Sequence, residues 1–297
     1  MLLNKKIPFA YIINKVKYQI IYVTVFSLLV YFLANRYQEI LPNIQLGVPA
    51  FIGTAISILL SFKLNQSYDR WWEARKIWGS IVNDSRSFVI QLQSFIKPGN
   101  EAAIKKIAYR QIAWCYVLGD ALRGKDPLKD VREFIAQKDF DSAERHKNKA
   151  LALLQMHARD LVDLRKDTQI EIFYHTQIDS TLVRLCESMG KAERIKSTVF
   201  PLTYRLFLLF AIYLFITTFT ISLSDFELYF QLPLSLLISL IFLLLEKSAR
   251  HMQDPFENRP TDTAMTATAR NIEINIRQLL GEENVPAPYP AQGYYLM

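Results

Sequence analysis

Residues 46–88 read LGVPAFIGTAISILLSFKLNQSYDRWWEARKIWGSIVNDSRSF, and this stretch changes character at Lys63. The part before Lys63 contains no Lys, Arg, Asp or Glu, and the uncharged run extends back to Ile40. That run is long enough to cross the apolar core of a bilayer, and the charges that begin at Lys63 mark where the chain returns to water. Neither Pro nor Gly occurs between Gln66 and Gly79, so the sequence predicts one helix that continues from the membrane into the aqueous phase.

Two stripes of side chains recur at four-residue spacing along the membrane part of this helix. The first stripe consists of small residues: Gly53, Ser57 and Ser61. The second stripe grows in bulk along the chain: Thr54, Ile58 and Phe62. Small residues at this spacing let two helices approach closely, which favours helix association in lipid. The second stripe has two interpretations. It is either ordinary lipid- or core-facing surface, or, with several copies of the helix around an axis, an apolar constriction that water and ions cross reluctantly.

Three short motifs carry a resemblance to a known family. The first is SYDRWWEARKIWG at residues 67–79, followed by NDSR at residues 83–86. The second is the triplet after the last apolar run, namely Asp254, Pro255 and Phe256. The third is a pair at the start of the third apolar run, Pro201 and Tyr204. On these motifs, which occur in the family's order over most of the chain, the sequence resembles the bestrophin family of ion channels, in particular its bacterial members.

The resemblance implies an all-α fold with four transmembrane helices and a cytoplasmic helical region, assembled as a homopentamer around an axial pore that the second helix lines. The implied pore neck consists of Thr54, Ile58 and Phe62. Thr54 departs from the family pattern, since that position is usually apolar. The implied cytoplasmic aperture is Phe200, a bulkier constriction than Ile or Val.

The charged and aromatic residues of the first motif have a structural interpretation. They are Arg70, Trp71, Trp72 and Glu73. The tryptophans are expected to pack between helices, and Arg70 and Glu73 are spaced to form an ion pair along the helix. We interpret this group as a support that holds the neck in position, not as conducting residues.

The bulk composition agrees with a protein that lies partly in lipid and partly in water. Of the 297 residues 51% are hydrophobic, and the mean hydropathy is +0.09. The chain is thus more apolar than an average soluble domain, yet too polar to lie wholly in a membrane. The net charge of +7 would indicate nucleic-acid binding if the basic residues clustered on a soluble face, and they do not. The expected partners are membrane lipid, small monovalent ions and further copies of the chain, with no nucleic acid.

Four uncharged runs set the predicted topology. Residues 18–35 form the first, after a basic segment without acids, and no small-residue cleavage site follows as it would in a signal peptide. Residues 206–224 and 228–245 form a helical hairpin with Pro233 early in the last span, where the first turn tolerates it. Basic flanks on one side of the spans predict a multi-pass protein of the cell (inner/plasma) membrane with both termini in the cytoplasm.

This topology divides the chain into four predicted parts. They are an N-terminal segment with the first two spans at 1–65, a cytoplasmic helical region at 66–199, the hairpin at 200–246 and a cytoplasmic tail at 247–297. In the second part apolar residues recur at helical spacing: Ile107, Ile112, Trp114, Val117 and Leu118. Breakers at 98–100 and 124–127 separate its helices. The tail contains a short amphipathic helix at 271–280 that Gly281 ends.

The sequence offers no pattern of catalytic residues, so an enzyme is not expected. Cys115 and Cys186 lie far apart and are expected to be buried free thiols. The four histidines show no metalloprotease spacing, and HARDL at 157–161 resembles a kinase catalytic loop only by chance, because no glycine-rich loop accompanies it.

Calcium is where the sequence departs from the animal members of the family. Those members carry a dense acidic cluster directly after the triplet, since calcium binds six to eight oxygens. Here the same place reads Glu257, Asn258, Arg259, Pro260, Thr261 and Asp262. Two acids with an arginine between them make a poor calcium site, so neither a metal nor another cofactor is expected.

Three functions remain open on the sequence. The leading one is a pentameric bestrophin-type channel that conducts small monovalent ions, chloride-like anions in preference to cations. A monovalent-cation channel of the same fold is the second. The third is a non-conducting, membrane-anchored scaffold or sensor whose working part is the region 66–199. A secondary transporter is disfavoured, since the spans show no internal repeat and no charged midplane group.

Overall fold

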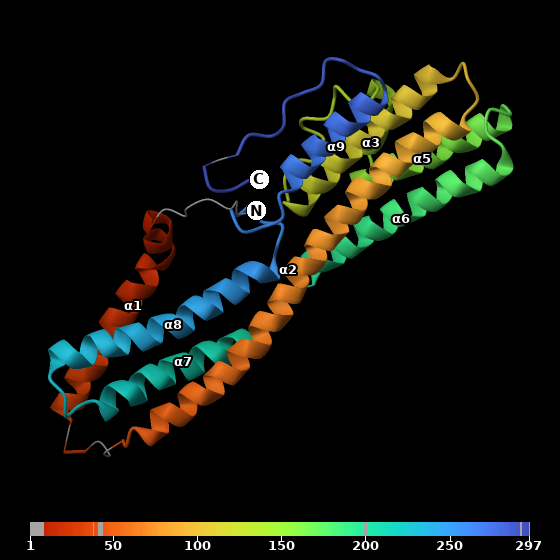
Figure 1. Cartoon of the computed structure of the whole chain (residues 1–297). Coiled ribbons are helices and arrows are strands. Elements are labelled where there is room, and N and C mark those ends of the chain that lie inside the picture. The colour runs from red at the N-terminus through yellow and green to blue at the C-terminus, as the bar shows by residue number, and fades with distance from the viewer. Residues whose placement is uncertain (1–8, 38, 41–43, 199–200, 292, 297) are drawn as a thin grey trace. The chain divides into compact units, whose positions relative to one another are not determined.

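The computed structural model describes all residues of the chain except 1–8, 38, 41–43, 199–200, 292 and 297. The described part consists of helices and connecting loops, with an isolated β-bridge between Ile96 and Ile170. Figure 1 labels most of these helices, which are α1 (Phe9–Arg36), α2 (Gly47–Phe95), α3 (Glu101–Leu122), α4 (Gln137–Glu144), α5 (Lys149–Lys166), α6 (Ile172–Ser197), α7 (Leu202–Ser222), α8 (Leu228–Gln253) and α9 (Met265–Leu279).

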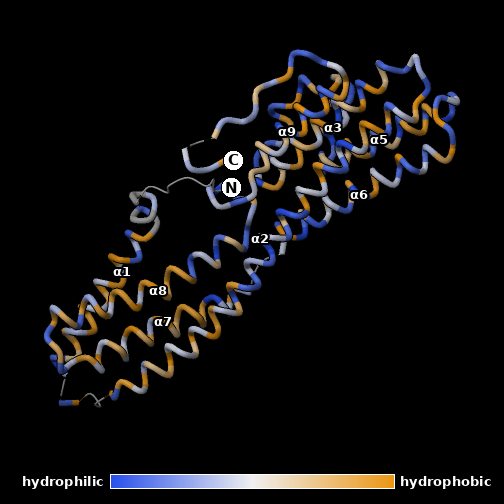
Figure 2. Tube along the Cα trace, in the orientation of Figure 1, coloured by the Kyte–Doolittle hydropathy of each residue, from blue (hydrophilic) through white to orange (hydrophobic). Residues whose placement is uncertain are grey.

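The helices belong to two compact units. We call the first the membrane unit, and it contains α1, α2 as far as Arg70, α7 and α8. The second, the polar unit, contains α2 from Trp71, α3 to α6, α9 and the C-terminal segment. The predicted all-α fold with four spans is confirmed. In the described residues four helices are long and apolar enough to cross a membrane, namely α1 from Val16, α2, α7 and α8, and their apolar stretches stand out in Figure 2. The predicted limits of the four parts of the chain stay a prediction.

The core of the membrane unit forms where α1, α2, α7 and α8 meet. Its buried residues are Val23, Ile56, Leu60, Leu208, Ile212, Phe215, Ile216, Phe219, Leu223 and Leu243. Inside lipid there is no water to exclude from such a core, so close packing and hydrogen bonds hold the helices together. One such bond links α7 to α2: the Tyr204 hydroxyl donates to the Leu59 carbonyl at 2.9 Å. The motif residue Tyr204 therefore has a structural part in this unit.

The polar unit is built around α3. The second half of α2 is amphipathic and buries residues at three- and four-residue spacing, among them Ala74, Ile77, Trp78 and Ile81. The residues that predicted a helix in the second part of the chain, Ile107, Ile112, Trp114, Val117 and Leu118, lie in α3 and are all buried. The breakers fall in the loops before and after α3, where Gly99 and Gly124 have positive φ values of 91° and 69°.

The predicted tail helix is present and longer than expected. α9 begins at Met265, six residues before the predicted start, because apolar residues such as Met265 and Ala269 extend its buried face. It ends as predicted: Gly281 has a φ of 76°, and its N–H donates to the carbonyl of Gln278 at 3.0 Å. Gly populates this left-handed conformation without the steric cost that a Cβ would add.

Candidate functional site

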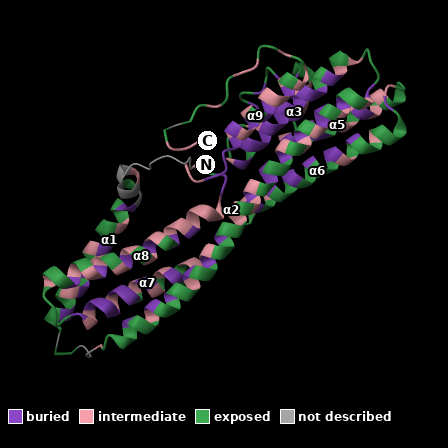
Figure 3. Ribbon diagram, viewed as in Figure 1, coloured by how far each residue is buried: buried purple, intermediate pink, exposed green. Residues whose placement is uncertain are grey.

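The membrane half of α2 has two unlike faces. Ile58 and Phe62 are 54% and 62% exposed, and Thr54 is exposed beside them. Figure 3 colours exposed residues green, and green recurs along this half of α2. Ile56, Leu60 and Lys63 are each 1% exposed. The faces are opposite, because Lys63 follows Thr54 by nine residues, which is about two and a half turns of an α-helix. The predicted stripe is thus an uncharged face that the chain itself leaves uncovered.

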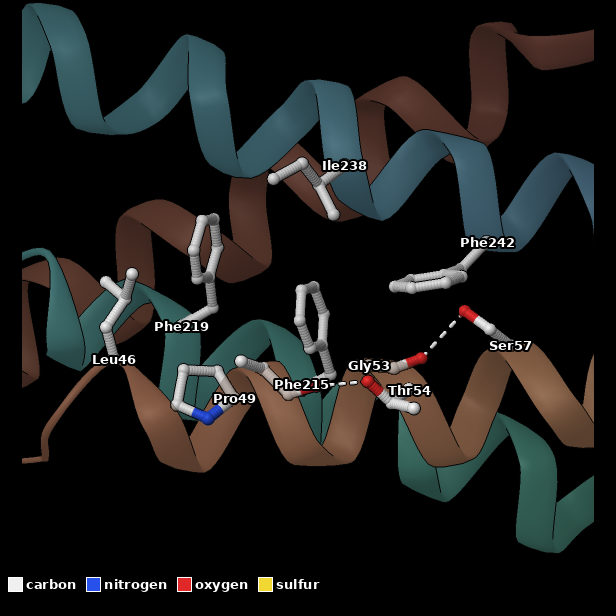
Figure 4. Close-up of a pocket in the computed structure, with 10 residues that line it drawn as sticks. Leu46, Pro49, Gly53, Thr54, Ser57, Phe215, Phe219, Ile238 and Phe242 are labelled. Atoms are coloured by element: carbon white, nitrogen blue, oxygen red, sulfur yellow. Dashed lines mark hydrogen bonds between the residues drawn. The ribbon is translucent and has the colours of Figure 1, made fainter.

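Of the small stripe, Gly53 is the residue at which α2 packs closely in the membrane unit. A Cβ on Gly53 would lie 3.3 Å from Cε2 of Phe215 and 3.7 Å from Cζ of Phe242. Figure 4 shows both rings beside the α2 backbone at this point, where they line a groove of about 340 Å³. Ser57 donates its hydroxyl to the Gly53 carbonyl at 2.8 Å, and Ser61 is exposed. Close packing therefore applies to Gly53, whereas Ser61 lies away from the core.

An ion pair lies on the buried face of α2. Lys63 Nζ is 3.1 Å from Glu246 Oε1 on α8, and the two side chains are 1% and 5% exposed. Lys63 is predicted to be the residue at which the helix enters water, and this prediction is wrong for the side chain, which is buried. The signal for the pair was present in the sequence: Lys63 follows the uncharged run of α2, and Glu246 directly follows the uncharged run of α8.

Two of the four residues interpreted as supports, Arg70 and Trp71, donate hydrogen bonds to backbone carbonyls at the end of α8 and in the loop that follows it. Arg70 Nε donates to the Gln253 carbonyl at 3.0 Å, and Trp71 Nε1 donates to the Thr261 carbonyl at 2.9 Å. Trp72 is 47% exposed, and its ring stacks on that of Trp71 with centroids 6.2 Å apart. The ion pair found for Glu73 is with Lys76 at 2.6 Å, not the expected one with Arg70. Arg70 and Lys76 are both three residues from Glu73, one turn before it and one turn after it, so either spacing allows an ion pair along the helix.

The triplet fastens the loop after α8 in the polar unit. Asp254 Oδ2 forms an ion pair with Lys196 Nζ at 2.6 Å, and Asp254 Oδ1 accepts a hydrogen bond from the Phe256 N–H at 3.2 Å. The Pro255 carbonyl accepts the Thr263 N–H at 3.1 Å. Phe256 is fully buried in the core of the unit. These three residues are therefore structural, which agrees with a motif that fixes a turn.

A comparison with protein families identifies this arrangement. The family model described as "Bacterial/Fungal Bestrophin protein" matches residues 7–278. The chain belongs to the bestrophin family. The expected resemblance is confirmed, and the match includes the α2 motif and the triplet.

Individual proteins are similar to nearly the whole chain. The "Voltage-dependent anion channel-forming protein YneE" of Escherichia coli K12 is 26% identical over 285 residues, which cover 96% of this chain and 93% of that protein. The "Voltage-dependent anion channel-forming protein mll4386" of Mesorhizobium japonicum is 27% identical over 284 residues, which cover 96% of this chain and 91% of that protein. Among solved structures, the bacterial bestrophin homologue of Klebsiella pneumoniae aligns with a TM-score of 0.84 at 25% identity, covering 91% of this chain and all of that chain.

The resemblance also implied an aperture at Phe200, and the residues after the triplet predicted a poor calcium site. Phe200, the predicted aperture, lies outside the described residues, so its role stays a prediction. In the segment that corresponds to the calcium region of animal bestrophins, Glu257 pairs with Arg259. Asp262 is 2% exposed and accepts the Arg259 N–H at 3.0 Å, while burial raises the pKa of its carboxyl. Both carboxylates are thus engaged by protein groups, and no cluster of three or more metal-binding side chains occurs in the described residues.

The chemically reactive side chains of the polar unit have structural surroundings. Cys115 is buried, which raises the pKa of its thiol to about 12, whereas Cys186 is exposed against expectation. His157 of the HARDL segment is fully buried against Phe88, with ring centroids 5.2 Å apart. Burial, together with the positive charges of Arg110 and Lys106, holds the pKa of His157 well below its ordinary value of 6.5. A neutral, enclosed imidazole agrees with the interpretation of this segment as a chance resemblance to a kinase loop.

Proposed function

We propose that this bestrophin is a pentameric channel that conducts small monovalent anions such as chloride. The observation that carries the proposal is the uncovered face of α2, because Ile58 and Phe62 are more than half exposed on a helix long and apolar enough to span a membrane. If several copies of α2 surrounded an axis, their uncovered faces would line a pore along that axis. The relatives named as voltage-dependent anion channel-forming proteins support the choice of anions.

The chemistry of the proposed neck is that of an apolar constriction. Rings of Ile58 and Phe62 would hold few waters, so an ion would pass only when the neck is wetted. The positive edge of a phenylalanine ring attracts an anion weakly, which favours chloride over potassium. Thr54 would make its end of the neck easier to wet. Its hydroxyl proton is donated to the Ala50 carbonyl at 2.9 Å, so the hydroxyl oxygen is the part that remains available to water.

The remaining parts of the proposal follow from topology and from the family. Phe200 would form the cytoplasmic aperture, while Arg70, Trp71, Trp72 and Glu73 would support the neck. The channel would lie in the cell membrane with both termini in the cytoplasm, as the basic flanks of the spans favour. It would need no calcium or other cofactor, and it would have no enzymatic activity.

The test is current through a planar bilayer that contains the purified protein, with unequal KCl concentrations on the two sides. The proposal predicts a steady current whose reversal potential lies near the equilibrium potential of chloride. A reversal potential near that of potassium would contradict the anion assignment and favour the cation channel. The absence of current from protein that is folded and inserted would favour the non-conducting scaffold. Binding partners of the polar unit would then be sought.

A further inference from the structure

The ion pair between Lys63 and Glu246 differs from the exposed ion pairs of this chain, because it is buried between two helices that can span a membrane. Both side chains are at least nine-tenths buried, and both belong to helices that are apolar enough to span a membrane. By contrast, Lys166 and Asp163 on α5 are 68% and 69% exposed. An exposed pair contributes little to stability, whereas removing one partner of a buried pair leaves a charge that the surroundings cannot solvate.

The pair fixes α2 against α8 in two respects. A charge needs its partner within a few ångströms, so the distance of 3.1 Å sets both the rotation of α2 about its axis and its position along α8. The apolar contacts of Ile56 and Leu60 on the same face are less directional, because they tolerate neighbouring rotations at a small cost. The Tyr204–Leu59 bond adds a second fixed point, on α7.

Rotation of α2 matters because of what lies on its other face. Phe62 directly precedes Lys63, and Thr54 lies about two and a half turns before Lys63 on the opposite side. Any rotation that moves Lys63 away from Glu246 also turns Ile58 and Phe62 by the same angle. The direction of the proposed neck side chains is therefore coupled to the geometry of the pair.

We infer that Lys63 and Glu246 form a positioning pair that aims the neck side chains of α2 at the pore axis. The inference rests on the proposed function, since it assigns the pair a role in that pore. Neither residue contacts the ion. Their charges select one rotation of α2, and the neck conducts and selects as it does because of that rotation.

The experiment separates positioning from folding with two double variants. In K63M/E246M the pair is replaced by apolar side chains, which commonly preserves or increases stability. We expect this variant to fold and assemble, yet to lose at least three-fold in single-channel conductance or to show several conductance levels. In K63E/E246K the pair is exchanged, and conductance within two-fold of the native channel is expected. The matched control, K166Q/D163N, removes an exposed pair and is expected to conduct like the native channel.

Each outcome bears on the inference. Native conductance of K63M/E246M overturns it, since apolar packing alone would then aim the neck. An exchanged variant that assembles but fails to recover conductance also overturns it, because pairing would not be the cause. The single variants K63M and E246Q are left out, as a lone buried charge can prevent folding.

A second readout does not depend on conduction. Phe62→Cys is introduced into a Cys186→Ser chain with and without the K63M/E246M change, and the rate of labelling by a water-soluble maleimide is measured. A change of at least three-fold between the two backgrounds supports positioning, and equal rates overturn it. If the native protein carries no current, the proposed function fails, and this labelling still tests whether the pair sets the direction of residue 62.

Discussion

At the scale of single residues, the exposed ring of Phe62 carries the proposed constriction. Phe62→Ala removes the largest side chain of the face, so the neck should widen and hold more water. We expect single-channel conductance to rise several-fold. The matched control is Phe32→Ala on α1, which removes a ring that is equally exposed, at 63%, and should leave conductance unchanged. An unchanged current from well-folded Phe62→Ala protein would argue that Phe62 does not face the pore.

His157 makes the stability of the polar unit depend on pH. Its folded-state pKa lies well below 6.5, so below about pH 6.5 the unfolded chain binds a proton that the folded chain does not. Stability should therefore fall as the pH drops through this range, by up to about 1.4 kcal/mol per pH unit for one group. We expect His157→Leu to flatten the dependence of the melting temperature on pH between 5 and 7. His146→Leu, at an exposed position, is the control, and equal slopes for native and His157→Leu protein would contradict the prediction.

The positions of some of these residues could be predicted from the sequence, and those of others could not, for a physical reason. The common face of Thr54, Ile58 and Phe62 was predictable, because spacing along a helix places residues on one face, whereas the sequence left open whether that face is covered. Lys63 was misjudged and Glu246 was missed, because a single charge beside an apolar run gives the same sequence pattern whether its side chain enters water or meets a partner. That partner is 183 residues away in the chain, and the sequence gives no measure of such a distance in space.

At the scale of elements, α2 contains two glycines with opposite surroundings. Gly53 packs against Phe215, whereas nothing lies within 4 Å of a Cβ at Gly79. Gly53→Val should push α2 from α7 and lower the free energy of unfolding by about 1–3 kcal/mol. Gly79→Ala should raise it by up to about 1 kcal/mol, because alanine favours a helix. Melting temperatures in detergent test both, and a native value for Gly53→Val would contradict the packing argument.

Elements with a strong pattern were predictable, and their limits were less so. The four spans and α3 were anticipated because an uninterrupted or periodic apolar pattern is unambiguous. The end of α9 followed from Gly281, while its start did not, since Thr266 and Thr268 on its first turns are weak helix formers and hide it in the sequence. The pairing of Glu73 was wrong because Arg70 and Lys76 are both three residues away from it.

At the scale of the whole molecule, the proposed pentamer makes a specific prediction about cross-linking. In a Cys186→Ser chain, Phe62→Cys should form disulfides between copies on mild oxidation, because five such residues would meet at the neck. Cys115 is buried, so each chain offers one accessible thiol and oxidation gives dimers on a denaturing gel. With five copies, at least one thiol at position 62 in each assembly stays unpaired. Leu60→Cys, on the buried face, is the control and should stay monomeric. Complete conversion of Phe62→Cys to dimers would contradict an assembly of five.

The bond between Lys63 and Glu246 also has a consequence for biosynthesis. At ribosomal rates of about 5–20 residues per second, the 183 residues that separate the partners take about ten to forty seconds to make. During that interval α2 is already translated, and its lysine has to reach toward the lipid headgroups, as such side chains do near membrane boundaries. The nascent helix can settle into its final rotation only once the last span has left the ribosome. The wall of the conducting path is therefore completed late, although it is among the first parts of the chain to be made.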